Sequence, residues 1–356
     1  AAGLSLAYHL AHSSLSDRSI LIIDREVKER NDHTWCFWSR ELTPFDALAY
    51  RTWDMLAFAS SDYEARFDLA PYRYRMIRSI DFYRFIRDTL APCPNIDFML
   101  GDIDRVVDAQ DHAEVWVNAL QLRGDWVFDS RFDIANYPLN CPGYHNLTQH
   151  FCGWEIETAA PVFDANIPYL FDFRTPQRGT MRFIYILPYT ERQGLIEYTL
   201  FSPNLIPYDE YEVALHDYLE GVLGVTDYQI LDKEWDRIPM TDYPFTRRAG
   251  QRVMNIGTRG GRVKASSGYA FLRIQHDSKA IVRSLERHGH PFDIPTAPPR
   301  YHTFDAVLLQ ILQHQGHLGE RIFTDLFDGN PIDRIFRFLD VESNLIENLR
   351  LMATVP

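Results

Sequence analysis

Near its beginning the chain reads Gly3-Leu4-Ser5-Leu6-Ala7-Tyr8-His9-Leu10 and, after a polar loop, Ile20-Leu21-Ile22-Ile23-Asp24. The first segment has the pattern of an amphipathic helix. The second is an apolar run ended by an acid, which is typical of a buried parallel strand. In dinucleotide-binding βαβ units such an acid binds the adenosine ribose about 20 residues after a glycine loop. Asp24 lies 21 residues after Gly3, which favours a dinucleotide site, although an ordinary helix and strand fit these residues equally well.

On this interpretation Gly3 is the third glycine of a G-x-G-x-x-G loop. The first strand and the first two glycines would then lie upstream of Ala1, and the sequence as given is expected to bind such a cofactor poorly unless the protein extends upstream. Residues 252–257 predict a later strand, followed by a glycine loop over 257–268 and a helix from Tyr269. Strand, glycine loop and helix occur here in the order that a dinucleotide-binding fold needs.

The middle of the chain has the pattern of an antiparallel sheet. We predict strands at residues 153–157, 169–173, 182–187 and 195–201, separated by turn signals. Centring the turns on those signals pairs Ile184 with Asp172 on one side and with Tyr198 on the other. Antiparallel sheet inserted into an α/β chain implies a second domain. Earlier in the chain, residues 72–77 are strand-like, and Ser79 is predicted to cap a helix.

Composition excludes several classes of protein. The 356 residues are 46% hydrophobic and 24% charged, and the net charge of −13 argues against nucleic-acid binding. The four cysteines form no C-x-x-C pair and no zinc-ligand spacing, so no metal site is expected and a reducing cytoplasm is the default. No apolar run approaches the roughly 20 residues that cross a bilayer, and the N-terminal residues lack the basic region of a signal peptide.

Two acidic residues lie within the predicted sheet. Glu197 falls in a strand whose two faces are both mainly apolar, where a carboxyl group is costly and therefore expected to be functional. The alternative is a solvent-facing window in the sheet. The predicted pairing places Asp172 on a flanking strand, about 10 Å from Glu197, so that both could act across one cavity. A structural ion pair of Asp172 with Arg174 or Arg182 is an equally good interpretation.

Several longer strings occur in a characteristic order. They are Asn31-Asp32-His33-Thr34-Trp35-Cys36-Phe37-Trp38, Tyr74-Arg75-Met76-Ile77-Arg78-Ser79, Phe171-Asp172-Phe173-Arg174, Leu195-Ile196-Glu197-Tyr198-Thr199-Leu200-Phe201-Ser202, Ile256-Gly257-Thr258-Arg259-Gly260-Gly261 and Gly268-Tyr269-Ala270-Phe271. Along nearly its whole length the chain resembles the bacterial lycopene β-cyclases of the lycopene cyclase family. That family belongs to the superfamily of glutathione-reductase-type and aromatic-hydroxylase-type flavoproteins.

The resemblance implies an α/β fold with a Rossmann-type FAD-binding domain of that class, an inserted antiparallel substrate domain and a helical C-terminal region. The expected FAD-binding domain is discontinuous and covers residues 1–60, 79–150 and 245–290. The substrate-binding domain covers 61–78 and 151–244, and the helical region covers 291–356.

The implied activity is lycopene β-cyclisation: an intramolecular lyase or isomerase that uses reduced FAD, with NAD(P)H as reductant, and involves no net redox change. Lycopene and other acyclic carotenoids are the expected substrates. A polyprenyl reductase or hydroxylase on the same scaffold, or a non-enzymatic isoprenoid-binding protein, is the alternative. Because lycopene resides in bilayers, we expect a cytoplasmic protein associated peripherally with the membrane.

Residue roles carry over from the resemblance. Glu197 aligns with the first acid of the Phe-Leu-Glu-Glu-Thr motif of plant cyclases, and Tyr198 stands in place of the second acid. Either Glu197 or the reduced flavin would donate the proton. Asp172 is the second catalytic candidate. The expected FAD contacts are Gly3, Asp24, Arg78, Gly257, Gly260, Gly261 and Gly268. The expected substrate lining is Trp35, Phe37, Trp38, Phe171 and Phe173, for which core packing is the alternative. Gly257-Thr258 replaces the Gly-Asp of related flavoenzymes, so no carboxylate contact to the ribityl chain is expected there.

Overall fold

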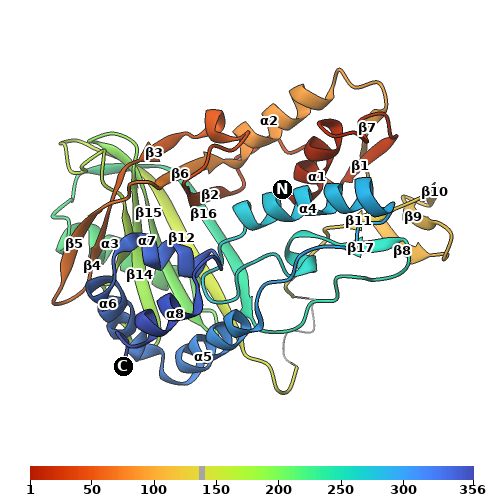
Figure 1. Cartoon of the computed structure of the whole chain (residues 1–356). Coiled ribbons are helices and arrows are strands. Elements are labelled where there is room, and N and C mark those ends of the chain that lie inside the picture. Colours follow the sequence, from red (N-terminus) through yellow and green to blue (C-terminus); the bar gives the residue numbers. More distant parts are fainter. Residues whose placement is uncertain (136–140) are drawn as a thin grey trace.

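The computed structural model describes residues 1–135 and 141–356. Helices and short strand pairs form the region at the upper right of Figure 1, which contains the N-terminus. Its elements are α1 (Ala2–Ala11), β1 (Ile20–Asp24), α2 (Ser79–Leu90), β7 (Ile96–Leu100), β8 (Ile103–Asp108), β9 (Ala113–Val117), β10 (Leu120–Gly124), β11 (Val127–Asp129), β17 (Val253–Asn255), η2 (Gly257–Gly260) and α4 (Phe271–His288). The predicted helix and strand near the N-terminus are confirmed as α1 and β1. Two parallel pairs, β1-β7 and β11-β17, lie beside an antiparallel sheet of order β10-β9-β8.

Ser79 is the first residue of α2, which confirms the predicted helix, and this helix buries Phe82, Ile86 and Leu90. Its hydroxyl does not cap the helix. It accepts hydrogen bonds from the backbone N–H groups of Asp32 (2.9 Å) and His33 (3.1 Å). The prediction of a Ser79 cap is therefore wrong, because this side chain connects α2 to the segment that precedes β2 (Thr34–Ser39).

A seven-stranded sheet forms the other half of the molecule (Figure 1). In spatial order its strands are β16 (Tyr228–Thr241), β12 (Asn146–Thr158), β15 (Gln193–Ser202), β14 (Met181–Pro188), β13 (Tyr169–Asp172), β4 (Met55–Ala59) and β5 (Glu64–Asp68). All neighbours are antiparallel except β13 and β4. The predicted register is confirmed, since Ile184 pairs with Asp172 and with Tyr198.

The order of the strands differs from a simple meander. Strands β13, β14 and β15 follow one another along the chain, as do β4 and β5, while β12 lies between β15 and β16. Strand β4 falls in the range 1–60 that we expected in the FAD-binding domain, yet it pairs with β13. The pairing is non-local and joins segments more than a hundred residues apart, which short-range patterns do not predict. The division into domains stays a prediction.

The two faces of the large sheet are covered differently. One face packs on α3 (Tyr208–Gly221) through a cluster that includes Ile184 and Tyr198. The opposite face packs on the small sheet β2-β6-β3 and on the C-terminal helices. The remaining elements are η1 (Asp46–Leu48), β3 (Arg51–Trp53), β6 (Arg73–Arg78), α5 (Pro299–Gln315), η3 (Gly316–Leu318), α6 (Gly319–Gly329), α7 (Ile332–Leu339) and α8 (Leu345–Met352). The predicted helical C-terminal region is thus confirmed, and it covers the sheet face that carries Glu197.

Candidate active site

Glu197 lies in the middle of β15 and is 8% exposed. Its neighbours on the same face, Leu195 and Phe201, belong to the core beneath the C-terminal helices. The hydroxyl of Thr199 donates a hydrogen bond of 2.6 Å to Oε1 of Glu197. Burial is the largest cause that raises the pKa of Glu197 well above its usual range, and a second carboxyl, Glu234, adds to it. The predicted buried acid is therefore present, and it does not face a solvent window.

Glu234 is a second carboxyl group at the same site, and the sequence did not point to it. Gly153 on β12 pairs with Glu197 on one side and with Glu234 of β16 on the other. Residues paired across adjacent strands share a face, so the two carboxyl groups flank a position without a side chain and interact electrostatically. A Cβ atom on Gly153 would lie 2.9 Å from Cγ and 3.2 Å from Oε1 of Glu234. Glycine keeps the space between the two acids open.

Glu234 is half-buried and is held from the side of the small sheet. The hydroxyl of Thr34 on β2 donates to its Oε2 at 3.3 Å. Burial raises the pKa of Glu234, as it does for Glu197. Nearby, His33 and Asp236 form an ion pair of 3.3 Å, with both side chains more than 40% exposed. The acid pair thus lies between a buried core on one side and a solvated ion pair on the other.

A group of hydroxyl and thiol side chains, of which Tyr74 and Tyr185 are buried and Cys36 and Tyr269 are half-buried, lies next to the acids. Its members come from four elements or loops: Cys36, Tyr74, Tyr185 and Tyr269. The hydroxyl groups of Tyr74 and Tyr269 are 3.4 Å apart. Burial raises the pKa of all four groups, that of Cys36 to about 12, so they remain protonated near neutral pH. They offer dipoles rather than charges to whatever occupies the site.

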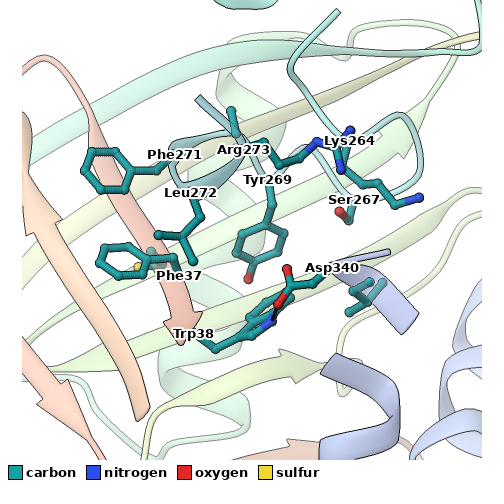
Figure 2. A pocket seen from close by; sticks show the side chains of 12 residues that line it. Phe37, Trp38, Lys264, Ser267, Tyr269, Phe271, Leu272, Arg273 and Asp340 are labelled. Atoms are coloured by element: carbon teal, nitrogen blue, oxygen red, sulfur yellow. Dashed lines mark hydrogen bonds between the residues drawn. The ribbon is translucent and has the colours of Figure 1, made fainter. Parts of the chain in front are cut away.

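A small cavity of about 20 Å³ opens beside Tyr269, between β2 and the N-terminus of α4. Figure 2 shows Phe37 and Phe271 at one end of it and Lys264 with Ser267 at the other. At its base Nε1 of Trp38 donates a 2.7 Å bond to Asp340, and burial raises the pKa of that carboxyl to about 7. The space holds about one water molecule, so the structure shows this site in a closed form.

Polar atoms at this cavity lack partners. Among the described residues, neither Oγ of Ser267 nor Nε of Arg273 has a hydrogen-bond partner, although both atoms are buried. Lys264 pairs with Asp305, and α4 starts here with its first turn toward the cavity. Unpaired buried donors are costly, and helix N-termini favour anions. The cavity is therefore suited to a polar or anionic group.

The predicted glycine loop adopts conformations that need glycine at two points. Gly257 has φ +61°, and a Cβ there would lie 2.8 Å from Cβ of Ala2, the first residue of α1. Gly268 has φ +73°, and a Cβ would lie 2.1 Å from Oε1 of Gln149. Only glycine tolerates such approach. Gly260 and Gly261 complete the turn after β17. The loop is thereby brought against the start of α1, where Gly3 lies.

Asp24 lines a second and larger cavity, of about 200 Å³, with Leu4 and Tyr83 among the other lining residues. It lies at the end of β1, as predicted. Arg78, also predicted to contact the cofactor, forms a 2.8 Å ion pair with Asp81 and lies 4.0 Å above the ring of Tyr50. Its guanidinium group is therefore already engaged by protein partners.

The five aromatic residues predicted to line the substrate site divide into two groups. Phe37 and Trp38 line the small cavity, and Trp35 stacks on Phe271 beside it. Phe171 and Phe173 instead pack in the core with Phe183 and Phe323, and are 5% and 1% exposed. In this closed form, core packing accounts for the second group.

Asp172 does not share a cavity with Glu197. Asp172 pairs with Ile184, and Ile184 pairs with Tyr198 on the next strand. Both of these residues face α3, whereas Glu197 faces the opposite way. Asp172 is fully buried and accepts hydrogen bonds from Arg174 (2.5 Å to Nη2) and from the hydroxyl of Tyr218 (2.5 Å). The expectation that both acids act across one cavity is therefore wrong, because residues paired across strands lie on the same face and Glu197 is one residue out of phase. The alternative, an ion pair with Arg174, is confirmed.

Comparison with known sequences gives one match. A model of the family described as lycopene cyclase protein matches residues 1–356, the whole chain. A search of curated proteins gave no significant match. Among the described residues, no helix has both the length and the apolar character that a membrane span requires.

Comparison with solved structures gives matches over nearly the whole chain at low identity. A geranylgeranyl bacteriochlorophyll reductase-like protein from Thermoplasma acidophilum has 11% identity and a TM-score of 0.59, covering 99% of this chain and 91% of that one. A flavin-dependent brominase has 13% identity and a TM-score of 0.57, covering 99% and 94%. The p-nitrophenol 4-monooxygenase of Pseudomonas putida DLL-E4 has 12% identity and a TM-score of 0.55, covering 99% and 93%. These likenesses confirm the predicted fold class.

Proposed function

Because the chain belongs to the lycopene cyclase family, we propose that it is a lycopene β-cyclase, an intramolecular lyase or isomerase. It would close the ψ end groups of lycopene into β-ionone rings, giving γ-carotene and then β-carotene without net oxidation or reduction. Glu197 is the observation that carries this proposal, since it is an acid buried on an apolar sheet face with a raised pKa. Such a group stays protonated near neutral pH and can protonate an alkene.

The reaction needs three things from the site: an acid, stabilisation of a carbocation and a base. Glu197 supplies the acid. The rings of Trp38 and Tyr269 lie 4.6 Å apart at the neighbouring cavity, and aromatic faces stabilise cations that lie against them. The buried hydroxyl groups of Tyr74 and Tyr185 add dipoles without adding a nucleophilic anion. The closed core excludes water, which would otherwise capture the cation as an alcohol.

We also propose that the protein binds FAD, which acts in its reduced form with NAD(P)H as reductant. Three observations support a site for it. Asp24 lines a 200 Å³ cavity suited to an adenosine ribose, Gly257 lies against the start of α1 where a pyrophosphate would be held, and the unpaired donors of Ser267 and Arg273 face the second cavity. Bound reduced FAD would supply an electron-rich ring that stabilises positive charge.

The substrate implies where the enzyme works. Lycopene is insoluble in water and resides in bilayers, so we propose that the protein is cytoplasmic and docks on the membrane surface to extract it. The small cavity has no room for a polyene end group, so the helices covering the sheet would have to move when substrate enters.

The proposal is tested by expressing the protein in cells that accumulate lycopene and measuring pigment composition. We expect conversion to β-carotene by the wild type, and conversion lost in Glu197→Gln with folding and FAD content retained. Glu157→Gln, an exposed acid on neighbouring β12, is the matched control and should convert lycopene as the wild type does.

Two results would contradict the proposal. Full conversion by Glu197→Gln would remove this acid from the mechanism. Oxidation of one NADPH per product would instead indicate a reductase or hydroxylase, because a cyclase needs its flavin reduced only catalytically.

A further inference from the structure

We propose that Glu234 is the base of the cyclisation and that it works with Glu197 as a pair sharing one proton. This proposal rests on the proposed cyclase function. It starts from a geometric fact: Glu197, Gly153 and Glu234 lie side by side on three adjacent strands, on one face of the sheet. The two acids flank the glycine, and the charge of Glu234 raises the pKa of Glu197, so the pair is most stable with one proton between its two carboxyl groups.

Each carboxyl group of the pair is held from outside by one threonine. Thr199 donates to Oε1 of Glu197, and Thr34 donates to Oε2 of Glu234. Oε1 of Glu234 lies over Gly153, on the side of Glu197. One oxygen of each acid is thus fixed by a hydroxyl group. This arrangement lets one carboxylic acid and one carboxylate face the same small volume. The protonated group can act there as the acid and the ionised group as the base.

Two neighbouring carboxylates, one buried and one half-buried, cannot both be ionised without an electrostatic cost. The groups that face the pair do not offset that cost fully: Cys36 and Tyr185 are uncharged, and His33 is engaged by Asp236 at the solvated edge. The pair therefore holds one proton across a wide pH range, and its protonation belongs to both groups together.

Ring closure needs one proton delivered and another removed, and a pair of one carboxylic acid and one carboxylate can carry out both transfers. The proton of Glu197 adds to the inner CH carbon of the terminal double bond, whose electron pair forms the new C–H bond and leaves a tertiary cation on the outer carbon that bears the two methyl groups. A second double bond attacks that cation and closes the ring, which moves the positive charge to the adjacent ring carbon. Glu234 then takes the hydrogen of the carbon newly joined to the ring, and the electrons of that C–H bond form the ring double bond.

The proton balance closes within the pair. Glu197 loses one proton and Glu234 gains one, and return of that proton from Glu234 to Glu197 restores the starting state without an oxidant or reductant. The carbon that is protonated and the carbon that is deprotonated are both bonded to the same quaternary carbon, so they lie on one side of the forming ring. Two acids separated by the width of a glycine position can therefore reach both.

The test is Glu234→Gln in the holoenzyme, with lycopene turnover and FAD content measured. General-base catalysis of this kind contributes about 100-fold or more, so we expect at least a 100-fold loss of turnover with FAD content unchanged and partial rescue by Glu234→Asp. Asp232→Asn, an exposed acid two residues before Glu234 on the same strand, is the matched control and should stay within about threefold of wild type. Gly153→Ala places a methyl group between the acids and should also lower turnover.

The double variant separates a shared unit from two independent residues. Groups that act together give losses that do not multiply, so Glu197→Gln/Glu234→Gln should be no slower than the slower single variant. Multiplied losses, or a Glu234→Gln enzyme within threefold of wild type while Glu197→Gln is inactive, would overturn the pair and leave the cyclase function standing. A wild type that makes no cyclic product would overturn the cyclase function, and the pair with it.

Discussion

Replacing Asp172 with asparagine tests whether this acid is part of the scaffold, as its contacts indicate. The carboxylate has no solvent exposure and accepts bonds from the backbone and side chain of Arg174 and from Tyr218. Asparagine keeps the shape but turns an NH₂ group toward donors. Breaking a buried ion pair costs roughly 3–5 kcal/mol. The lower end applies because Arg174 is 31% exposed and also lies 3.7 Å from Glu64.

A loss of about 3 kcal/mol, at roughly 2 °C per kcal/mol for a large chain, lowers the melting temperature by about 6 °C. Differential scanning calorimetry measures it, with Asp217→Asn as control, since that exposed acid on α3 lies beside Tyr218 and should change stability by less than about 0.5 kcal/mol. Melting of Asp172→Asn within 1 °C of wild type would refute the structural role. Unchanged stability with lost ring closure would restore Asp172 as a catalytic candidate.

Two further predictions concern pH. Burial raises the pKa of Glu197 above 4.5 in the folded state. The folded protein therefore binds more protons than the unfolded chain, and wild-type stability falls as the pH rises above that value. In thermal scans the melting temperature of Glu197→Gln should rise relative to that of the wild type as the pH increases, and a difference that does not change with pH would contradict a buried neutral acid. Asp340 has its pKa raised from 3.8 to about 7, so its contribution is lost between about pH 4 and pH 7. Asp340→Asn keeps an acceptor for Trp38. Between about pH 4 and pH 7 its free energy of unfolding should fall by about 1–2 kcal/mol less than that of the wild type, a figure that allows for partial solvent exposure. Denaturant titrations at a series of pH values measure this difference.

The local patterns predicted much of the fold. The run of apolar residues in β1, the glycine loop before α4 and the turns between β13, β14 and β15 were all placed correctly, because each depends on residues close in sequence. Strand order was less accessible. The pairing of β4 with β13 and the position of β12 beside β16 depend on contacts between distant segments, which no short-range periodicity encodes.

The site was predicted in part for the same reason. Glu197 stands out as an acid in an apolar strand, and burial confirms that interpretation. Glu234 lies in the mostly charged run Asp232-Lys233-Glu234-Trp235-Asp236-Arg237, which resembles a solvent-exposed segment. Only the register through Gly153 brings it beside Glu197. The sequence feature that could have indicated this site is Gly153, a glycine inside a predicted strand between Cys152 and Trp154. The side chain of Asp172 lies on the same face as Ile184 and Tyr198, and therefore on the face opposite to that of Glu197.

All eight residues of β14, Met181–Pro188, are buried, with one face against α3 and the other against the C-terminal helices. Its amide hydrogens should therefore exchange with deuterium only when the whole protein unfolds, whereas those of the covering helices can exchange through local opening. A long apolar substrate of the kind proposed above would then enter by displacing the covering helices while the sheet beneath stays rigid. The large sheet would then be the rigid part of the binding region, and the C-terminal helices would be the part that moves.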